Sequence, residues 1–254
     1  MRVQSLILRF ILFGCAVFIG CVRQPLLLPD AKNPMFSGGS TAFTTNDLVR
    51  AVAEIDVEQA GSSHQTRAAL LLKKPSYLRV EILSVMGITG LCVITAPEKM
   101  TVYLPSKNEF YFGVPSRQNI GKFLPLQLDA EEIVLMLTGS VPGLTDEGVQ
   151  RRLKQENDVW RLEMNRPAGV SQTAFFNHKG LIRLTRSGED PKQWLSVDYF
   201  YENAAESMPS KIVFTTADGG YVRITYTDVS LEKTDDVSMF DMNIPADATV
   251  IDLN

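Results

Sequence analysis

The sequence is poor in the residues that hold metals and nucleic acids. Its 254 residues include two histidines and three cysteines, and 29 acidic residues outnumber 25 basic ones. Neither His64 nor His178 lies at metal-ligand spacing from another histidine or a cysteine. The chain also has no basic stripe of the kind that binds nucleic acid. We therefore expect no metal, no cofactor and no nucleic-acid partner.

The usual catalytic motifs are missing as well. There is no nucleophile elbow, no zinc-protease HExxH, no Walker loop and no dinucleotide-binding GxGxxG. Cys92 lies within an apolar run, which is typical of a buried small side chain and not of a nucleophile. The adjacent carboxylates Glu131 and Glu132 read as the charged start of a helix. We do not expect an enzyme, and a hydrolase is the least favoured class of function.

The N-terminus has no apolar run long enough to span a membrane. The uncharged segment 10–20 is shorter than the roughly 20 residues that a bilayer core requires. Lengthening it toward Val3 would bury Arg9, at a cost of about 2.5–3.5 kcal/mol near a helix centre. With Arg2 and Arg9 as a basic n-region, residues 1–20 instead predict a cleaved export signal.

The leader ends in Phe18-Ile19-Gly20-Cys21, which resembles a bacterial lipoprotein lipobox and would make Cys21 the acylated first residue. The rival segment Leu12-Phe13-Gly14-Cys15 leaves too short an apolar run after Arg9. A third interpretation is that Cys21 is an incidental apolar residue of the leader and is not acylated. Removing Arg2 and Arg9 changes the formal net charge from −4 to −4 − 2 = −6. The residue after Cys21 is not the aspartate that resembles an inner-membrane retention signal, so we expect an outer-membrane lipoprotein whose domain faces the periplasm.

Residues 21–43 carry prolines, glycines and serines without periodicity and predict a tether, so the folded domain should be 44–254. Within it, apolar and polar side chains alternate in many short runs separated by turn signals. The clearest runs are 77–83, 100–104, 195–201 and 222–227. This pattern predicts a mainly β (α+β) fold: an antiparallel sheet curled toward an unclosed half-barrel.

Three segments read as helices. Asp129 with Glu132 three residues later is a capping-box arrangement before an apolar stripe that ends near Gly139. A short helix is expected at 116–123, and a third at Thr44–Val52, where a cap candidate precedes apolar residues at helical spacing. The helices between the two groups of strands are expected to cover the open face of the sheet.

Four blocks in order resemble the LolB-like family of outer-membrane lipoprotein receptors, within the LolA/LolB superfamily. They are Leu78–Gly87, Leu124–Gly143, Gly180–Tyr199 and Met208–Ile224. No block is specific alone; their order behind a lipobox carries the resemblance. The chain departs at its end, where the segment from Phe240 to Ile251 looks more like the C-terminal strand of LolA, the soluble relative.

The resemblance implies a half-barrel with a helical lid over an apolar cavity. It implies no catalytic residue and no cofactor. The partners implied are acylated lipoproteins, a LolA-like periplasmic carrier and outer-membrane lipid. It also implies a protruding loop that inserts lipoproteins into the membrane, here Val85, Met86, Gly87 and Ile88, with Met86 in place of the family's usual leucine.

The residues expected to line the cavity are the inward members of the alternating runs and of the helix stripe. They are Leu78, Val80, Ile82, Met100, Val102, Ile133, Met136, Leu137, Leu195, Val197, Val222 and Ile224. Alternation alone does not separate a cavity from a dry core, and Met86 could instead pack inward in a hairpin turn. An envelope-assembly or lipid-binding lipoprotein that uses this fold as an interaction module therefore stays open as the alternative function.

Overall fold

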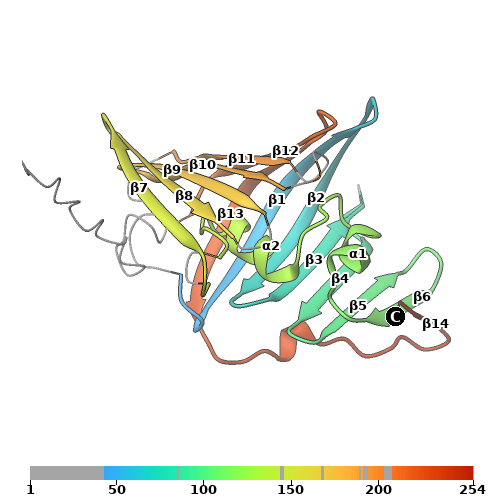
Figure 1. The fold of residues 1–254 in the computed structure, drawn as a ribbon. Coiled ribbons are helices and arrows are strands. Elements are labelled where there is room, and N and C mark those ends of the chain that lie inside the picture. Colours follow the sequence, from blue (N-terminus) through green and yellow to red (C-terminus); the bar gives the residue numbers. More distant parts are fainter. Residues whose placement is uncertain are drawn as a thin grey trace, which may run out of the picture.

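A computed structural model describes residues 43–253, except residue 85 and residues 144–145, 167–168, 189, 191–193 and 203–207. The expected leader, the acylation site at Cys21 and nearly all of the expected tether lie outside the described residues. Val85 of the expected insertion loop also lies outside them. The described part is mostly β-structure (Figure 1).

The strands are β1 (Asp47–Gln59), β2 (Ser62–Lys73), β3 (Tyr77–Leu83), β4 (Thr89–Ala96), β5 (Lys99–Leu104), β6 (Glu109–Gly113), β7 (Gln150–Glu156), β8 (Val159–Asn165), β9 (Ser171–Asn177), β10 (Gly180–Ser187), β11 (Leu195–Phe200), β12 (Lys211–Thr216), β13 (Tyr221–Lys233) and β14 (Thr249–Asp252). They form one sheet in the order β14-β6-β5-β4-β3-β2-β1-β13-β12-β11-β10-β9-β8-β7. Strands β14 and β7 form its two ends, and β14 and β6 are the only described strands that pair in parallel. The predicted unclosed, mainly antiparallel sheet is confirmed, and Figure 1 shows it curled into a trough.

Two α-helices lie between β6 and β7 in the described chain, α1 (Arg117–Gly121) and α2 (Ala130–Leu137). Ser116 caps α1, because its Oγ accepts a hydrogen bond from the Asn119 N–H (3.2 Å). The capping box of α2 is present, and Glu132 Oε2 accepts from the Asp129 N–H (3.4 Å). Gly139 follows α2 with a φ of +69°, a value that glycine adopts without strain. The two central helices are thus where the sequence predicts them.

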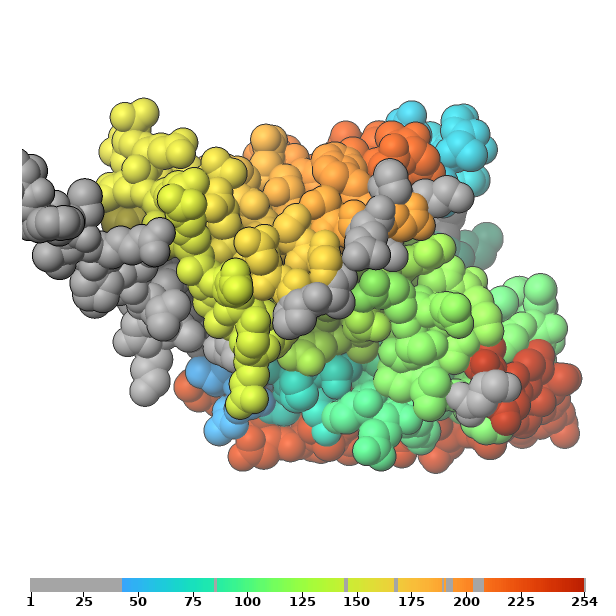
Figure 2. Space-filling view, viewed as in Figure 1, coloured from blue at the N-terminus to red at the C-terminus, as the bar shows by residue number. Residues whose placement is uncertain are grey.

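The sheet face that carries these helices, here called the inner face, holds the main core. Successive side chains of a strand point to opposite faces, so Leu78 and Val80 of β3 share the inner face. The β3 register places Leu78 beside Leu72 and Val80 beside Leu70 of β2. These residues join the helix stripe of α2 in one buried cluster that reaches across the sheet from β5 to β8. In Figure 2, green atoms of the helical segment fill the space between the orange strands and the teal strands.

The helix expected at Thr44–Val52 is wrong, because the segment from Asp47 onward is strand β1. Leu48 and Val49 are both fully buried, although they point to opposite faces of the sheet. A strand covered on both faces carries neighbouring apolar residues instead of an alternation. That run imitates the spacing of a helix.

The opposite face, here called the outer face, is covered at β1 and β4 by the C-terminal segment. After β13 the chain enters a short 3-10 helix, η2 (Ser238–Phe240), and ends in β14 beside β6. Phe240 is buried with Leu48, Cys92 and Ile94 in a second apolar cluster. The segment that departs from the receptor pattern therefore extends the sheet and shields its outer face.

Candidate functional site

The loop between β3 and β4 presents two large apolar side chains to solvent. Met86 is 87% exposed and Ile88 is 65% exposed. The backbone of this loop is hydrogen-bonded: the Ser84 N–H donates to the Ile88 carbonyl (2.8 Å), and the Gly87 N–H donates to the Ser84 carbonyl (2.8 Å). Gly87 has a φ of +75°, so this turn needs a residue without a Cβ. The turn holds Met86 and Ile88 outward.

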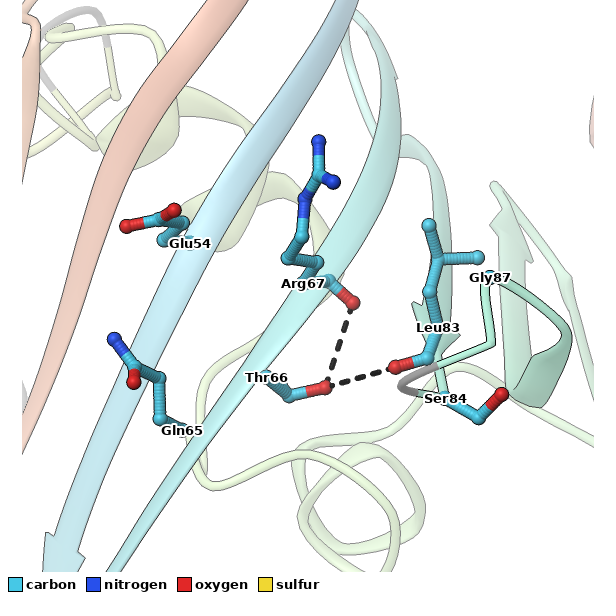
Figure 3. Close-up of a pocket in the computed structure, with 7 residues that line it drawn as sticks. All are labelled: Glu54, Gln65, Thr66, Arg67, Leu83, Ser84 and Gly87. Carbon is cyan, nitrogen blue, oxygen red and sulfur yellow. Dashed lines mark hydrogen bonds between the residues drawn. The ribbon is translucent and has the colours of Figure 1, made fainter.

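A hollow of about 520 Å³ lies beside this loop. It is lined by Glu54, Gln65, Thr66, Arg67, Leu83, Ser84 and Gly87. Figure 3 shows these residues on β1, on β2, at the end of β3 and in the loop after it, with Thr66 Oγ1 donating to the Leu83 carbonyl (3.2 Å). Because five of its seven lining residues have polar side chains, the hollow differs from the apolar cavity expected from the sequence.

The twelve residues expected to line a cavity come together on the inner face. Eleven are less than 9% exposed and belong to the main core cluster, and Ile82 is partly buried against that cluster. Here they pack against one another and against α2. Whether they also open to hold an acyl chain stays a prediction.

A buried ion pair joins α2 to the sheet. Arg186 Nη2 of β10 lies 2.8 Å from Glu132 Oε1, and their side chains are only 7% and 10% exposed. Arg186 also donates to Gln172 Oε1 (3.1 Å), and Gln172 Nε2 donates to the Pro142 carbonyl (2.9 Å). Glu132 has a second partner in Arg117 (3.2 Å). Sequence reasoning missed this network, although Arg186 follows Leu184 at strand spacing and therefore shares its inner face.

Three tyrosines of the sheet interact with one another, and two of them, Tyr201 and Tyr226, reach the C-terminal end of α2. Tyr226 donates its hydroxyl to the Leu137 carbonyl (2.8 Å). Tyr199 and Tyr201 are 4% and 9% exposed, and their hydroxyl groups have no hydrogen-bond partner among the described residues. Burial raises the pKa of all three phenols, so each stays a neutral donor at physiological pH.

The cysteine and the two histidines of the described chain lie apart from one another and form no common site. Cys92 is buried, and this burial raises the pKa of its thiol to about 11, which disfavours the thiolate. His64 and His178 are both exposed. His64 follows the turn between β1 and β2, and His178 lies in the turn between β9 and β10. Within the described ranges, no three acidic, histidine or cysteine side chains gather as metal ligands. In the same ranges no helix is long and apolar enough to cross a membrane.

Comparison with solved structures identifies the fold. A LolA superfamily protein from Nitrosomonas europaea is 14% identical, with a TM-score of 0.52 over 78% of this chain and 92% of that one. A domain described as an outer membrane lipoprotein-sorting protein from Vibrio parahaemolyticus is 13% identical, with a TM-score of 0.56. A DUF1329 family protein from Desulfovibrio piger is also 13% identical, with a TM-score of 0.57. The last two alignments each cover 78% of this chain and 90% of the other.

No protein-family model and no curated protein matches this sequence. At 13–14% identity the structural likeness establishes the fold alone. The domain therefore has a LolA-like fold, and its function must be argued from its own residues.

Proposed function

We propose that this chain is an outer-membrane lipoprotein, anchored through an acylated Cys21, that binds the acyl chains of other lipoproteins and inserts them into the outer membrane. Its domain faces the periplasm and receives its cargo from a LolA-like carrier. The inner face of the sheet holds the acyl chains, and the loop that contains Met86 contacts the membrane. No cofactor and no nucleotide enters this scheme.

The single observation that carries the proposal is the exposed pair Met86 and Ile88. Scattered apolar residues are ordinary on a protein surface, but here two large ones lie two residues apart at the tip of one hydrogen-bonded loop. Burying a methionine side chain fully stabilises by about 1.5–3 kcal/mol. A loop of this kind therefore gains free energy when it enters the interfacial region of a bilayer.

Cargo binding requires α2 to move away from the inner face. Each buried methylene of an acyl chain contributes about 0.8 kcal/mol, so the chains need an apolar container while they are outside a membrane. The inner face supplies apolar side chains, and α2 packs on it through its own apolar stripe and a few polar contacts, notably Arg186 with Glu132 and Tyr226 with Leu137. Displacing α2 would expose an apolar groove on the inner face that can bury acyl chains.

The second candidate is an interaction module of the same fold that binds a protein and carries no lipid. The observation in its favour is the close packing of the inner face, where the expected lining residues form a buried cluster. Native mass spectrometry of the mature chain, purified without detergent, separates the two. Co-purified lipid or acyl peptide supports the carrier, and a lipid-free chain that retains a protein partner supports the module.

The decisive test of the lead proposal replaces Met86 by glutamate. Because this side chain is 87% exposed, Met86→Glu should leave the melting temperature and acyl-peptide binding unchanged. It should reduce transfer of a bound lipoprotein to liposomes at least tenfold, because a carboxylate resists entry into the bilayer interface. Thermal melting and a transfer assay on the same preparation measure both effects.

Ile244→Glu is the matched control. Ile244 is also an exposed aliphatic residue (56%), and it belongs to the C-terminal segment that meets the start of β5 through the Lys99–Asp241 ion pair. This variant should transfer lipoprotein like the wild type. Normal transfer by Met86→Glu, with normal stability, would remove the loop from the delivery step.

A further inference from the structure

Two buried hydroxyl groups on the inner face have no acceptor. Tyr199 and Tyr201 are more than nine-tenths buried, and neither hydroxyl has a hydrogen-bond partner among the described residues. A buried donor without an acceptor costs the folded state about 1–3 kcal/mol. Buried polar groups are satisfied in the great majority of proteins, so an adjacent pair of exceptions calls for an explanation.

The end of α2 does not supply the missing acceptors. Its last carbonyls already accept other donors: those of Val134 and Leu135 from Thr138, and that of Leu137 from Tyr226. Gly139 approaches Tyr201 so closely that a Cβ there would lie 2.9 Å from the hydroxyl oxygen. The Tyr201 hydroxyl therefore lies at the C-terminal end of α2 without a bond to it, and the Tyr199 hydroxyl interacts electrostatically with those of Tyr201 and Tyr226.

The wall beside this pair is apolar, and the nearby cations have partners: Lys179 Nζ donates to the backbone carbonyl of Tyr201 (3.4 Å). Tyr199 is paired in the sheet with Ile212, which is fully buried, and Ile212 is paired with Ile224. The cation that acts on Tyr199, Arg186, is already bonded to Glu132 and Gln172. An apolar wall with a few aimed polar groups is the usual make-up of a small-molecule site. A phenol hydroxyl donates one hydrogen bond and supplies no charge, so this pair suits a carbonyl oxygen better than a phosphate or a carboxylate.

We propose that Tyr199 and Tyr201 form a head-group subsite that donates hydrogen bonds to the ester or amide carbonyl oxygens of an acylated ligand. The ligand enters when the C-terminal end of α2 moves off the sheet, so its chains lie along the apolar inner face while its carbonyls reach the two phenols. This inference rests on the proposed function and specifies the ligand further: acyl chains joined through carbonyls are preferred to plain hydrocarbon or ether chains.

The test compares a soluble cysteine peptide carrying two palmitoyl ester chains with the same peptide carrying two hexadecyl ether chains. The protein is the full mature chain with Cys21→Ser, which keeps every described residue and has no acyl group of its own to compete. The chain with both tyrosines should bind the ester probe about tenfold more tightly than the ether probe. That ratio corresponds to the net free energy of two modest hydrogen bonds. The double variant Tyr199→Phe with Tyr201→Phe should reduce that preference to less than twofold.

Stability provides the second readout, and Tyr226→Phe is the matched control. Without ligand, the double variant should melt at or above the wild-type temperature, because removing an unpartnered hydroxyl breaks no bond. Tyr226→Phe deprives the Leu137 carbonyl of its donor, so it should melt lower yet keep the preference for the ester probe. A lower melting temperature for the double variant would show that the hydroxyls are bonded within the protein and would overturn the subsite.

The binding outcomes separate this inference from the proposed function. Equal binding of the ester and ether probes by the wild type leaves acyl binding intact and overturns the tyrosine subsite. Binding of neither probe overturns both. A second probe pair, phosphatidylethanolamine with ester or ether chains, distinguishes the source of the carbonyl. An ester preference confined to that pair supports the subsite and overturns the lipoprotein as its ligand.

Discussion

In the buried ion pair between Arg186 and Glu132, the other partners of each residue determine how much its charge contributes to stability. Both charges are out of water, so their attraction must offset a large desolvation cost. The two partners are not equivalent, however. Glu132 has Arg117 as a second cation, whereas Arg186 has only the neutral Gln172 besides Glu132 among the described side chains.

This asymmetry predicts unequal effects of removing either charge. Glu132→Gln leaves a buried guanidinium without a counter-charge and should lower the free energy of unfolding by about 3–5 kcal/mol. Arg186→Met leaves Glu132 paired with Arg117, so it should cost only about 1–2 kcal/mol. Urea unfolding of both variants measures the difference.

Arg183→Met is the control for this comparison, because Arg183 lies on the same strand with a half-exposed side chain. Its ion pair with Asp198 should contribute no more than about 1 kcal/mol. Equal losses for Glu132→Gln and Arg186→Met would show that Arg117 does not support the carboxylate once Arg186 is gone.

For single residues, the sequence predicts which face of the sheet a side chain lies on better than it predicts its hydrogen-bond partner. The alternation of Val197, Tyr199 and Tyr201 places all three on one side of the sheet, and the structure buries all three. The alternation does not indicate which tyrosine finds an acceptor, because the acceptors come from α2, far away in the chain. The exposure of Met86 is likewise set by the turn around Gly87 and not by the composition of the loop.

At the element scale, local signals succeed where one face of an element is buried. Strand β3 has the bounds that alternation predicts, 77–83, and α2 begins after the predicted cap at Asp129. The failure at β1 has a long-range cause. Leu48 is buried on the outer face by Phe240, a residue that follows it by most of the length of the domain.

The C-terminal segment should therefore shield the apolar cluster on the outer face from solvent. Phe240→Ala removes the aromatic ring that packs on Tyr77, with ring centroids 5.3 Å apart, and that covers Cys92. We expect a loss of about 3–5 kcal/mol in the free energy of unfolding. We also expect faster labelling of Cys92 by a thiol reagent, measured in the mature chain with Cys21→Ser, where Cys92 is the remaining cysteine.

Ile244→Ala is the comparison variant in the same segment. Its side chain is 56% exposed, so it should change stability by less than about 0.5 kcal/mol and leave the labelling rate of Cys92 as it was. If Phe240→Ala labels no faster than Ile244→Ala, the outer cluster is held by the strands without help from the C-terminal segment.

At the scale of the whole molecule, an unclosed sheet has two edges to protect. Strand β7 carries charged and amide side chains over most of its length, which discourages pairing with another chain. At the other end, β14 covers the edge of β6 and is itself only four residues long. Sequence patterns reveal the polar edge, but the parallel pairing of β14 depends on contacts across the whole domain.

The whole-molecule scheme also requires a single anchoring point ahead of the domain, and the N-terminal segment offers two candidate cysteines, Cys15 and Cys21. Acylation at Cys15 would leave only residues 10–14 as the apolar run after Arg9, shorter than the roughly 7–15 residues of an export signal. We therefore expect Cys21→Ala to abolish incorporation of labelled palmitate and to leave an uncleaved precursor or a soluble form. Cys15→Ala, the matched control, should be labelled and fractionate with outer membranes like the wild type. Loss of label in Cys15→Ala alone would move the anchor to Cys15, and a cleaved Cys21→Ala protein still held in outer membranes would refute anchoring by acylation at Cys21.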